Sequence, residues 1–300
     1  MGAHVRVPAT SANLGPGFDA LGLALSWYDD VSAVRSGSVL QVDVSGACAD
    51  DVPRDESHLI VRAMDATFAE LGEERGGLVL RCENSIPHGI GIGSSAAAVV
   101  AGVLLARALA HEGADRLDDQ AVLGLAARLE GHPDNAAAAL LGGFTIAWPQ
   151  PPGARAVRLE PAPSLRAVLL LPDSVLATAT ARGLLPASVP HADAAHAAAR
   201  SALLVHAITA EPALLLAATE DRLHQDYREP AMPQTLALVA RLRAAGLAAV
   251  VSGAGPSVLV LGGRELTETT VAGAVEGTPE GSWTLRAVDL DRSGAQVSGW

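Results

Sequence analysis

The sequence predicts a mixed α and β fold in two halves. Strand-like segments with apolar or alternating side chains recur along the chain, and alanine-rich segments with helical periodicity lie between them. Each half also contains one glycine-rich loop. The length of 300 residues and the hydrophobic content of 49% fit roughly two domains, each with a core of its own.

The first half predicts strands and helices in mixed order. Residues 4–10 predict a strand, residues 11–20 a polar loop, and residues 21–27 a second short apolar element. Gly72 closes a predicted helix at 58–72, because glycine tolerates the left-handed conformation that ends many helices. The other predicted elements are strands at 39–46 and 77–87, a helix that follows Ser95 and reaches Arg107, a helix at 118–132, and a segment at 133–148.

The sequence PQPPGA at 149–154 is the best candidate for a linker, because proline and glycine interrupt regular structure. It divides the chain into predicted domains at 1–150 and 155–300. Beyond it, residues 166–172 and 248–263 predict strands, and two alanine-rich helical stretches separate them.

Residues 86–106, IPHGIGIGSSAAAVVAGVLLA, carry no charge and allow three interpretations: a membrane span, a buried helix, or a glycine loop leading into a helix. A span needs about 20 predominantly apolar residues, and the apolar part here runs only from Ala96 to Arg107. Unpaired N–H groups at a helix N-terminus favour an anion. The glycines alone fit a tight turn as well as a phosphate site. The serine pair at the N-cap position, followed by a helix, favours the phosphate site.

The charge of the chain argues against several classes of partner. With 33 acidic and 21 basic residues the net charge is −12, so neither nucleic acid nor an anionic membrane is expected to bind. Every basic residue is arginine, which excludes a Walker A lysine and Schiff-base chemistry. Cys48 and Cys82 lie far apart and predict two reduced thiols in a cytoplasmic protein.

Four motifs carry a resemblance to a known family. PHGIGIGSS at 87–95 and SGAGPS at 252–257 resemble two glycine loops of the small-molecule kinases named for galactose, homoserine, mevalonate and phosphomevalonate, the GHMP kinases. TSANLGPGFDALG at 10–22 and EGHPDNAAAALLGG at 130–143 are similar to the homoserine kinase family within that superfamily. The resemblance extends from about residue 5 to the end of the sequence.

The resemblance implies an α+β protein with the two-domain GHMP kinase fold, whose first domain holds the phosphate loop and whose second domain is ferredoxin-like. It implies phosphorylation of L-homoserine to O-phospho-L-homoserine in threonine biosynthesis, with ATP and Mg²⁺. It also implies a cytoplasmic homodimer without nucleic-acid or membrane partners. Two alternatives stay open, namely a GHMP-type kinase for another small alcohol and a non-catalytic relative that senses ATP or an amino acid.

Carried over residue by residue, the resemblance implies three groups of site residues. Ser95 and Glu130 would bind Mg²⁺. Nucleotide contacts would come from Pro87, His88, Gly89, Ile90, Gly91, Ile92, Gly93, Ser94, Ser95, Ala96, Ala97, Gly253 and Gly255. Homoserine contacts would come from Asn13, Asp19, His132, Asn135, Thr178, Arg182 and Arg228. The two arginines would bind the carboxylate and Asp19 the ammonium group. Asp19, Glu130 and Asn135 are the expected catalytic residues, without a strong general base.

Three positions depart from the family pattern. Ile92 replaces a leucine of similar size, which is expected to matter little. Ile90 replaces a basic residue and removes one phosphate contact. His58 stands where an asparagine frequently contacts adenine, so the adenine contacts are left open.

Overall fold

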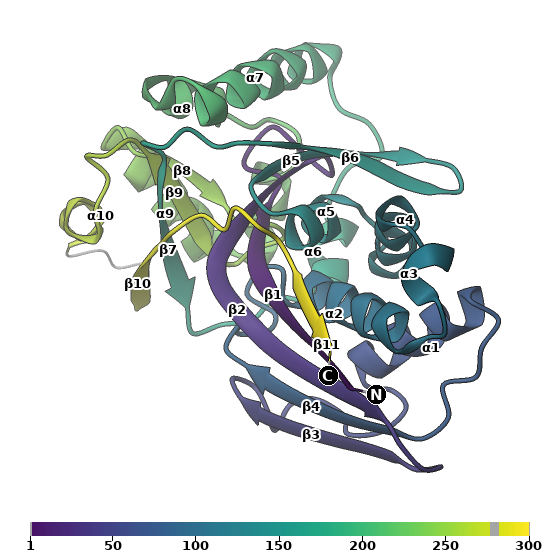
Figure 1. Cartoon of the computed structure of the whole chain (residues 1–300). Helices are drawn as coiled ribbons and strands as arrows, with labels where there is room; N and C mark the ends of the chain where they lie inside the picture. Colours follow the sequence, from purple (N-terminus) through teal and green to yellow (C-terminus); the bar gives the residue numbers. More distant parts are fainter. Residues whose placement is uncertain (1, 277–281, 300) are drawn as a thin grey trace.

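The chain folds around two β-sheets, and a computed structural model describes residues 2–276 and 282–299. Seven strands form the larger sheet and four form the smaller one. Figure 1 shows the helices of the first half gathered on one face of the larger sheet. The α+β fold expected from the sequence is therefore confirmed.

The larger sheet is built on two long antiparallel strands that bend together through the molecule (Figure 1). Its strand order is β11-β1-β2-β4-β3, and β5 pairs with both β2 and β6. Only the pair of β3 and β4 is parallel, as a β-α-β crossover through α1 requires. The bounds are β1 (Gly2–Ala12), β2 (Leu21–Arg35), β3 (Leu40–Gly46), β4 (Leu78–Asn84), β5 (Phe144–Gln150), β6 (Gly153–Leu159) and β11 (Gln296–Gly299).

The helix α2 (Ser94–Leu109) lies at the centre of this half. It packs against β1 and against the helices α1, α3, α4 and α5, and most of its side chains are buried. A helix that is apolar on all sides must be buried or span a membrane, and the 16 residues of α2 reach about 24 Å, less than a bilayer core. Its neighbours in the chain are α1 (Leu59–Glu70), α3 (Gly113–Arg116), α4 (Asp119–Glu130) and α5 (Asp134–Leu141).

The smaller sheet has the ferredoxin-like strand order β10-β7-β9-β8, and all its pairs are antiparallel. Its strands are β7 (Arg166–Pro172), β8 (Ala248–Val251), β9 (Val258–Gly262) and β10 (Trp283–Val288). The helical segments of this half are α6 (Thr178–Gly183), α7 (His191–Thr209), η1 (Pro212–Leu214), α8 (Leu215–Ala218), η2 (Asp226–Ala231), α9 (Pro233–Ala244) and α10 (Glu268–Val275).

Both faces of the smaller sheet are covered. Along β7, Ala167 and Leu169 join the large core shared with the first half, while Val168 and Leu170 join a second core. Because successive side chains of a strand point to opposite faces, a strand buried on both sides is a continuous apolar run, as RAVLLLP is.

The linker predicted at 149–154 is wrong. These residues form the end of β5, a two-residue turn at 151–152 and the start of β6, and the two strands pair from Phe144 and Leu159 to Gln150 and Gly153. Proline and glycine mark a tight turn as readily as a flexible connection. The predicted domains at 1–150 and 155–300 remain a prediction, but the chain changes sheet later, between β6 and β7.

Substitution of Gly102 would test how closely α1 and α2 pack. A Cβ at Gly102 of α2 would lie 2.6 Å from the carbonyl oxygen of Ile60 and 2.7 Å from Cβ of Ala63, both in α1. We expect Gly102→Ala to lower the thermal midpoint by a few degrees. Overpacking costs about 1–3 kcal/mol, which exceeds the gain of about 1 kcal/mol in helix propensity.

Gly273 of α10 is the matched control, because nothing lies within 4 Å of the Cβ that an alanine would add. We expect Gly273→Ala to leave the midpoint unchanged or raise it. A Gly102→Ala variant as stable as the wild type, measured by thermal unfolding, would contradict the close contact.

Candidate active site

Three segments from distant parts of the chain form a single platform. The end of β1, the glycine loop between β4 and α2, and the loop between β8 and β9 exchange backbone hydrogen bonds. Thr10 N–H donates to Ile92 O over 3.0 Å, Gly253 N–H donates to Ala12 O over 3.2 Å, and Ser257 N–H donates to Ile90 O over 3.1 Å. Both glycine loops are thereby fixed against the end of β1.

Glycine is required in the first glycine loop for two reasons. Gly91 and Gly93 have φ of +84° and +74°, in the left-handed region. A Cβ at Gly91 would also lie 2.7 Å from the carbonyl oxygen of Gly255, and one at Gly93 would overlap Oγ1 of Thr10. The loop is therefore a tight turn pressed against its neighbours, and its backbone is also open to a ligand at the N-terminus of α2.

The N-cap of α2 differs from the expected one. Gly93 is the N-cap and makes no side-chain cap hydrogen bond, whereas Ser94 and Ser95 are the first helical residues. The first N–H groups of a helix have no intrahelical partner, and a glycine cap supplies none. The predicted serine cap is wrong, and the structure leaves these donors available to an anion.

A cavity of about 160 Å³ opens in front of this helix end. Most of the predicted residues line it, and they come from both halves of the chain. Its walls are Asn13, Gly89, Gly91, Gly93, Ser94, Ser95, Glu130, His132, Asp134, Asn135, Leu176, Ala177, Thr178, Arg182, Arg228, Gly253 and Ala254.

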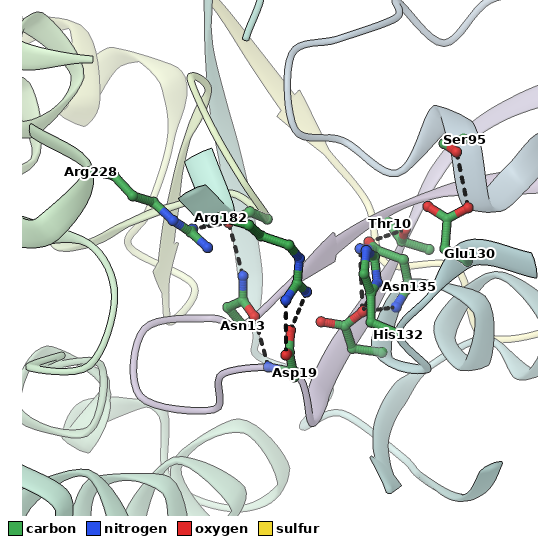
Figure 2. A network of polar contacts seen from close by, with 11 residues as sticks. Thr10, Asn13, Asp19, Ser95, Glu130, His132, Asn135, Arg182 and Arg228 are labelled. Atoms are coloured by element: carbon green, nitrogen blue, oxygen red, sulfur yellow. Dashed lines mark hydrogen bonds and ion pairs between the residues drawn. The ribbon is translucent and has the colours of Figure 1, made fainter. Parts of the chain in front are cut away.

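Glu130 and Ser95 lie together at one end of the cavity (Figure 2). The Ser95 hydroxyl donates to Oε2 of Glu130 over 2.9 Å. Burial raises the pKa of the Glu130 carboxyl, although His132 and the Ser95 hydrogen bond lower it. Two oxygen donors in a partly desolvated position can hold a divalent cation, which would favour the ionised carboxylate.

Asp134 organises the middle of the cavity. It is 2% exposed, and its Oδ1 accepts the backbone N–H of Asn135 over 2.7 Å and lies 3.0 Å from Nδ1 of His132. The side-chain oxygen of Asn135 in turn accepts from the Thr10 hydroxyl over 2.7 Å. The amide group of Asn135 and the ring of His132 are thus oriented by fixed partners.

Asp19 and Arg182 form an ion pair at the opposite side (Figure 2). Nη1 of Arg182 donates to Oδ2 of Asp19 over 3.1 Å, and Nη2 donates to Oδ1. The Asn13 side chain accepts from the Asp19 N–H over 3.0 Å and donates to Gly253 O over 2.9 Å. The two residues expected to bind opposite charges of one ligand are therefore paired with each other in the structure.

Arg228 is 1% exposed, which is unusual for a guanidinium group. Its Nη1 donates to Gly253 O and to Nδ1 of His224, each over 3.1 Å. Within the described ranges its Nε has no hydrogen-bond partner. Burial and the nearby charge of Arg182 lower its pKa to about 10, so it stays charged at neutral pH and favours an anionic ligand.

A second, more apolar cavity of about 300 Å³ lies on the other side of the glycine loop, sharing Gly89, Ser94 and Ser95 with the first. His58 and His88 line it together with aliphatic side chains. Nδ1 of His58 accepts from the N–H of Ile60 over 3.3 Å, so this histidine caps α1.

Some predicted residues do not face the first cavity. Ile90, Ile92, Ala96 and Ala97 are buried in the core, so their side chains offer nothing to a ligand there. Asp19, Pro87 and Gly255 do not line it, although Asp19 is paired with Arg182, which does. His88 lines the second cavity instead. Asp134, Leu176, Ala177 and Ala254 line the first cavity but were not predicted. For Asp134 the signal was its place between His132 and Asn135, whereas the loop at 176–177 carried none.

Comparisons with known proteins match both halves of the chain. Residues 58–143 match the family described as GHMP kinases N terminal domain, and residues 200–276 match GHMP kinases C terminal. A homoserine kinase of Streptomyces coelicolor is 54% identical over 98% of this chain and 94% of its own length. A homoserine kinase of Clavibacter michiganensis subsp. michiganensis is 51% identical, also over 98% of this chain and 94% of its own length.

Solved structures share the fold. The crystal structure of a homoserine kinase from Cytophaga hutchinsonii aligns with a TM-score of 0.82 at 24% identity, covering 99% of this chain and 97% of that one. A mevalonate kinase of L. major aligns with a TM-score of 0.66 at 15% identity, covering 98% and 96%. In the part of the chain that the structure describes, no helix is sufficiently long and apolar to cross a bilayer.

The contact between His132 and Asp134 predicts a raised histidine pKa. Burial lowers the pKa of His132, but the hydrogen bond and charge of Asp134 and the charge of Glu130 raise it above its ordinary value of 6.5. This pair therefore stabilises the fold below about pH 6.5, and the stabilisation is lost as pH rises through the folded pKa. In an NMR titration we expect His132 to titrate above 6.5, and at lower pH in Asp134→Asn. An unchanged midpoint in the variant would refute the pairing.

Proposed function

The chain belongs to the homoserine kinase family of the GHMP kinases, and we propose on that premise that it transfers the γ-phosphoryl group of ATP to the hydroxyl group of L-homoserine. The observation that carries this proposal is the arrangement of the cavity. A glycine loop, a helix N-terminus and Glu130 lie at one end, and two arginines lie at the other. Phosphate and an amino-acid carboxylate would thus meet across a single small volume.

The N-terminus of α2 supports the nucleotide part of the proposal. The N–H groups of Gly93, Ser94 and Ser95 have no side-chain cap and would bind phosphate oxygens. The second cavity would accept the nucleoside, because it adjoins the same glycine loop and its lining is largely apolar. His58 lines this cavity, so a histidine ring would contact the base where the family frequently has asparagine.

Ser95 and Glu130 fit the donor set that Mg²⁺ needs, because both present oxygen atoms and the glutamate is partly desolvated. These two residues would hold the ion together with phosphate oxygens. When bound, Mg²⁺ neutralises charge that develops on the transferring phosphoryl group. The residues of the chain orient the partners.

The acceptor site has groups for each end of homoserine. Arg228 is a buried cation whose Nε has no hydrogen-bond partner among the described residues, and Arg182 offers a planar fork to a carboxylate. Asp19 would bind the ammonium group. The ion pair between Asp19 and Arg182 satisfies both charges before substrate binds, so homoserine would exchange one set of opposite charges for another.

Positioning carries most of the proposed catalysis, because phosphoryl transfer leaves little covalent work for the protein. Asn135, oriented by Thr10, and Asp19 would align the hydroxyl oxygen with the γ-phosphorus. The oxygen would form the new bond to the γ-phosphorus as the bond between that phosphorus and ADP breaks, and the hydroxyl proton would pass to the transferred phosphoryl group, without a strong general base. The cytoplasmic location and the homodimer implied by the family stay predictions.

The metal site predicts a catalytic defect without loss of fold. Glu130→Gln keeps an oxygen that can accept from the Ser95 hydroxyl but removes the charge that would hold Mg²⁺. We expect kcat at saturating Mg²⁺ to fall about 10²- to 10³-fold, as when one group that stabilises transition-state charge is removed. The affinity for Mg²⁺ with nucleotide, measured by calorimetry, should fall as well.

Glu70→Gln is the matched control, since the Glu70 side chain is exposed and forms an ion pair with Arg128 on the surface. It should keep wild-type kinetics. Wild-type turnover in Glu130→Gln would rule out the metal role.

The acceptor arginines predict a loss that depends on the substrate carboxylate. Removing Arg182 or Arg228 deletes a charge-assisted contact, a loss of about 1.5–3 kcal/mol or roughly ten- to a hundredfold in kcat/KM for homoserine. The analogue 3-aminopropan-1-ol lacks the carboxylate, so Arg182→Ala and Arg228→Ala should barely change its kcat/KM. The KM for ATP should stay near the wild-type value.

Arg81→Ala serves as the control, because the Arg81 side chain is 71% exposed on the surface of β4. If the analogue loses as much as homoserine does, the arginines are structural or serve the nucleotide. Phosphorylation of other alcohols in preference to homoserine would favour a different GHMP-type activity, and no phosphorylation would favour a non-catalytic relative.

A further inference from the structure

His224 lies directly behind the acceptor end of the cavity and is not among the site residues predicted from the sequence. It is 0% exposed, in the segment between α8 and η2. Its ring stacks on Phe18 of the loop between β1 and β2, with centroids 5.0 Å apart and an interplanar angle of 29°. The guanidinium groups of Arg182 and Arg228 lie over the same Phe18 ring, at 5.5 and 5.6 Å. The imidazole is thus packed among the groups that form the acceptor site.

The partners of the ring determine which nitrogen carries the proton. Nδ1 lies 3.1 Å from Nη1 of Arg228, and Nε2 lies 2.8 Å from the carbonyl oxygen of Gly15. An arginine can only donate and a carbonyl can only accept. Nδ1 must therefore be the acceptor, and Nε2 must carry the hydrogen. These two contacts require a neutral imidazole in one tautomer.

The surrounding charges are compatible with a neutral ring. Burial lowers the pKa of His224, and the charge of Arg228 lowers it further. Asp221, 3.6 Å from Nε2, and Asp19 act in the opposite direction. A proton on Nδ1 would point at the guanidinium group and remove its acceptor. The fixed tautomer is thus part of what keeps Arg228 in place.

We infer that His224 is a positioning residue, which holds the Arg228 guanidinium toward the acceptor cavity and ties it to the loop that carries Asn13 and Asp19. Arg228 has two fixed acceptors, Nδ1 of His224 and Gly253 O, while its Nε has no partner in residues 2–276 and 282–299. A long arginine side chain held by two acceptors loses little further rotamer freedom when a carboxylate binds.

The inference rests on the proposed role of Arg228. Three substitutions separate the hydrogen bond of the ring to Arg228 from its hydrogen bond to Gly15 O. His224→Gln places an amide nitrogen near Nε2 and keeps the donor to Gly15 O, but loses the acceptor for Arg228. His224→Asn places an oxygen near Nδ1 and keeps that acceptor. His224→Phe keeps the packing on Phe18 and loses both hydrogen bonds.

We expect kcat/KM for homoserine to fall roughly tenfold in His224→Gln and His224→Phe, as for loss of one hydrogen bond to a charged group, and to recover much of that loss in His224→Asn. For 3-aminopropan-1-ol the three variants should match the wild type, and the KM for ATP should not change. His206→Gln, at an exposed histidine of α7, is the control and should behave as wild type.

The failure of the proposed carboxylate site and the failure of the positioning role give different results. If Arg228→Ala does not discriminate homoserine from the analogue, the proposed carboxylate site fails. If Arg228→Ala discriminates but His224→Gln and His224→Phe do not, only the positioning role fails.

A measurement on the wild-type protein tests the inference even if the variants do not fold. Ring ¹⁵N chemical shifts should show His224 neutral and protonated on Nε2 at pH 7. A ring protonated on Nδ1, or on both nitrogens, overturns the inference.

Discussion

The close approach of three backbone segments is the constraint on which the site depends. Gly91 and Gly93 leave no room for a side chain between the glycine loop, the end of β1 and the loop after β8. This contact fixes the helix N-terminus of the first half against Gly253 of the second half. Asn13 and Arg228 both donate to that Gly253 carbonyl, so the acceptor groups take their positions from the same junction. A change at the junction would move the phosphate end and the acceptor end together.

Charge is separated within the cavity although the chain as a whole carries a net charge of −12. Glu130 lies toward the helix end and Asp134 in the middle, whereas Arg182 and Arg228 lie opposite, where Asp19 is paired with Arg182. Arg228 carries a charge that burial makes costly, and its backbone acceptor and a neutral histidine offset only part of that cost. In the part of the chain that the structure describes, Arg228 has neutral acceptors and forms no ion pair, so its buried charge favours an anionic ligand. Exposed ion pairs on the surface contribute little by comparison.

The sequence was sufficient to predict the central helix and strands of the fold and most of the residues that line the first cavity. The apolar run of α2, the two-sided strand β7 and the glycine loops each follow from local composition. The strands β10 and β11 escaped prediction because they are short and largely exposed, so their pairing depends on partners far away in sequence. His224 escaped for a related reason. A histidine between ordinary loop residues carries no local signal, and its importance comes from Gly15 and Arg228, which only the tertiary structure brings to it.

The pairing of β1 with β11 has a consequence for how the molecule is made. Ala3 lies opposite Gly299, so one edge of β1 is completed by residues from the other end of the sequence. During synthesis β1 would pair with β2 early. The other edge of β1 would stay open until β11 is made. The same late segment places the backbone of Asp291 and Ala295 against Gly143 and Ala139, beside the helix that follows His132. The larger sheet and the contacts of this segment with α5 therefore cannot be completed before residues 291–299 are present, and β10 of the smaller sheet comes only shortly before them in the chain.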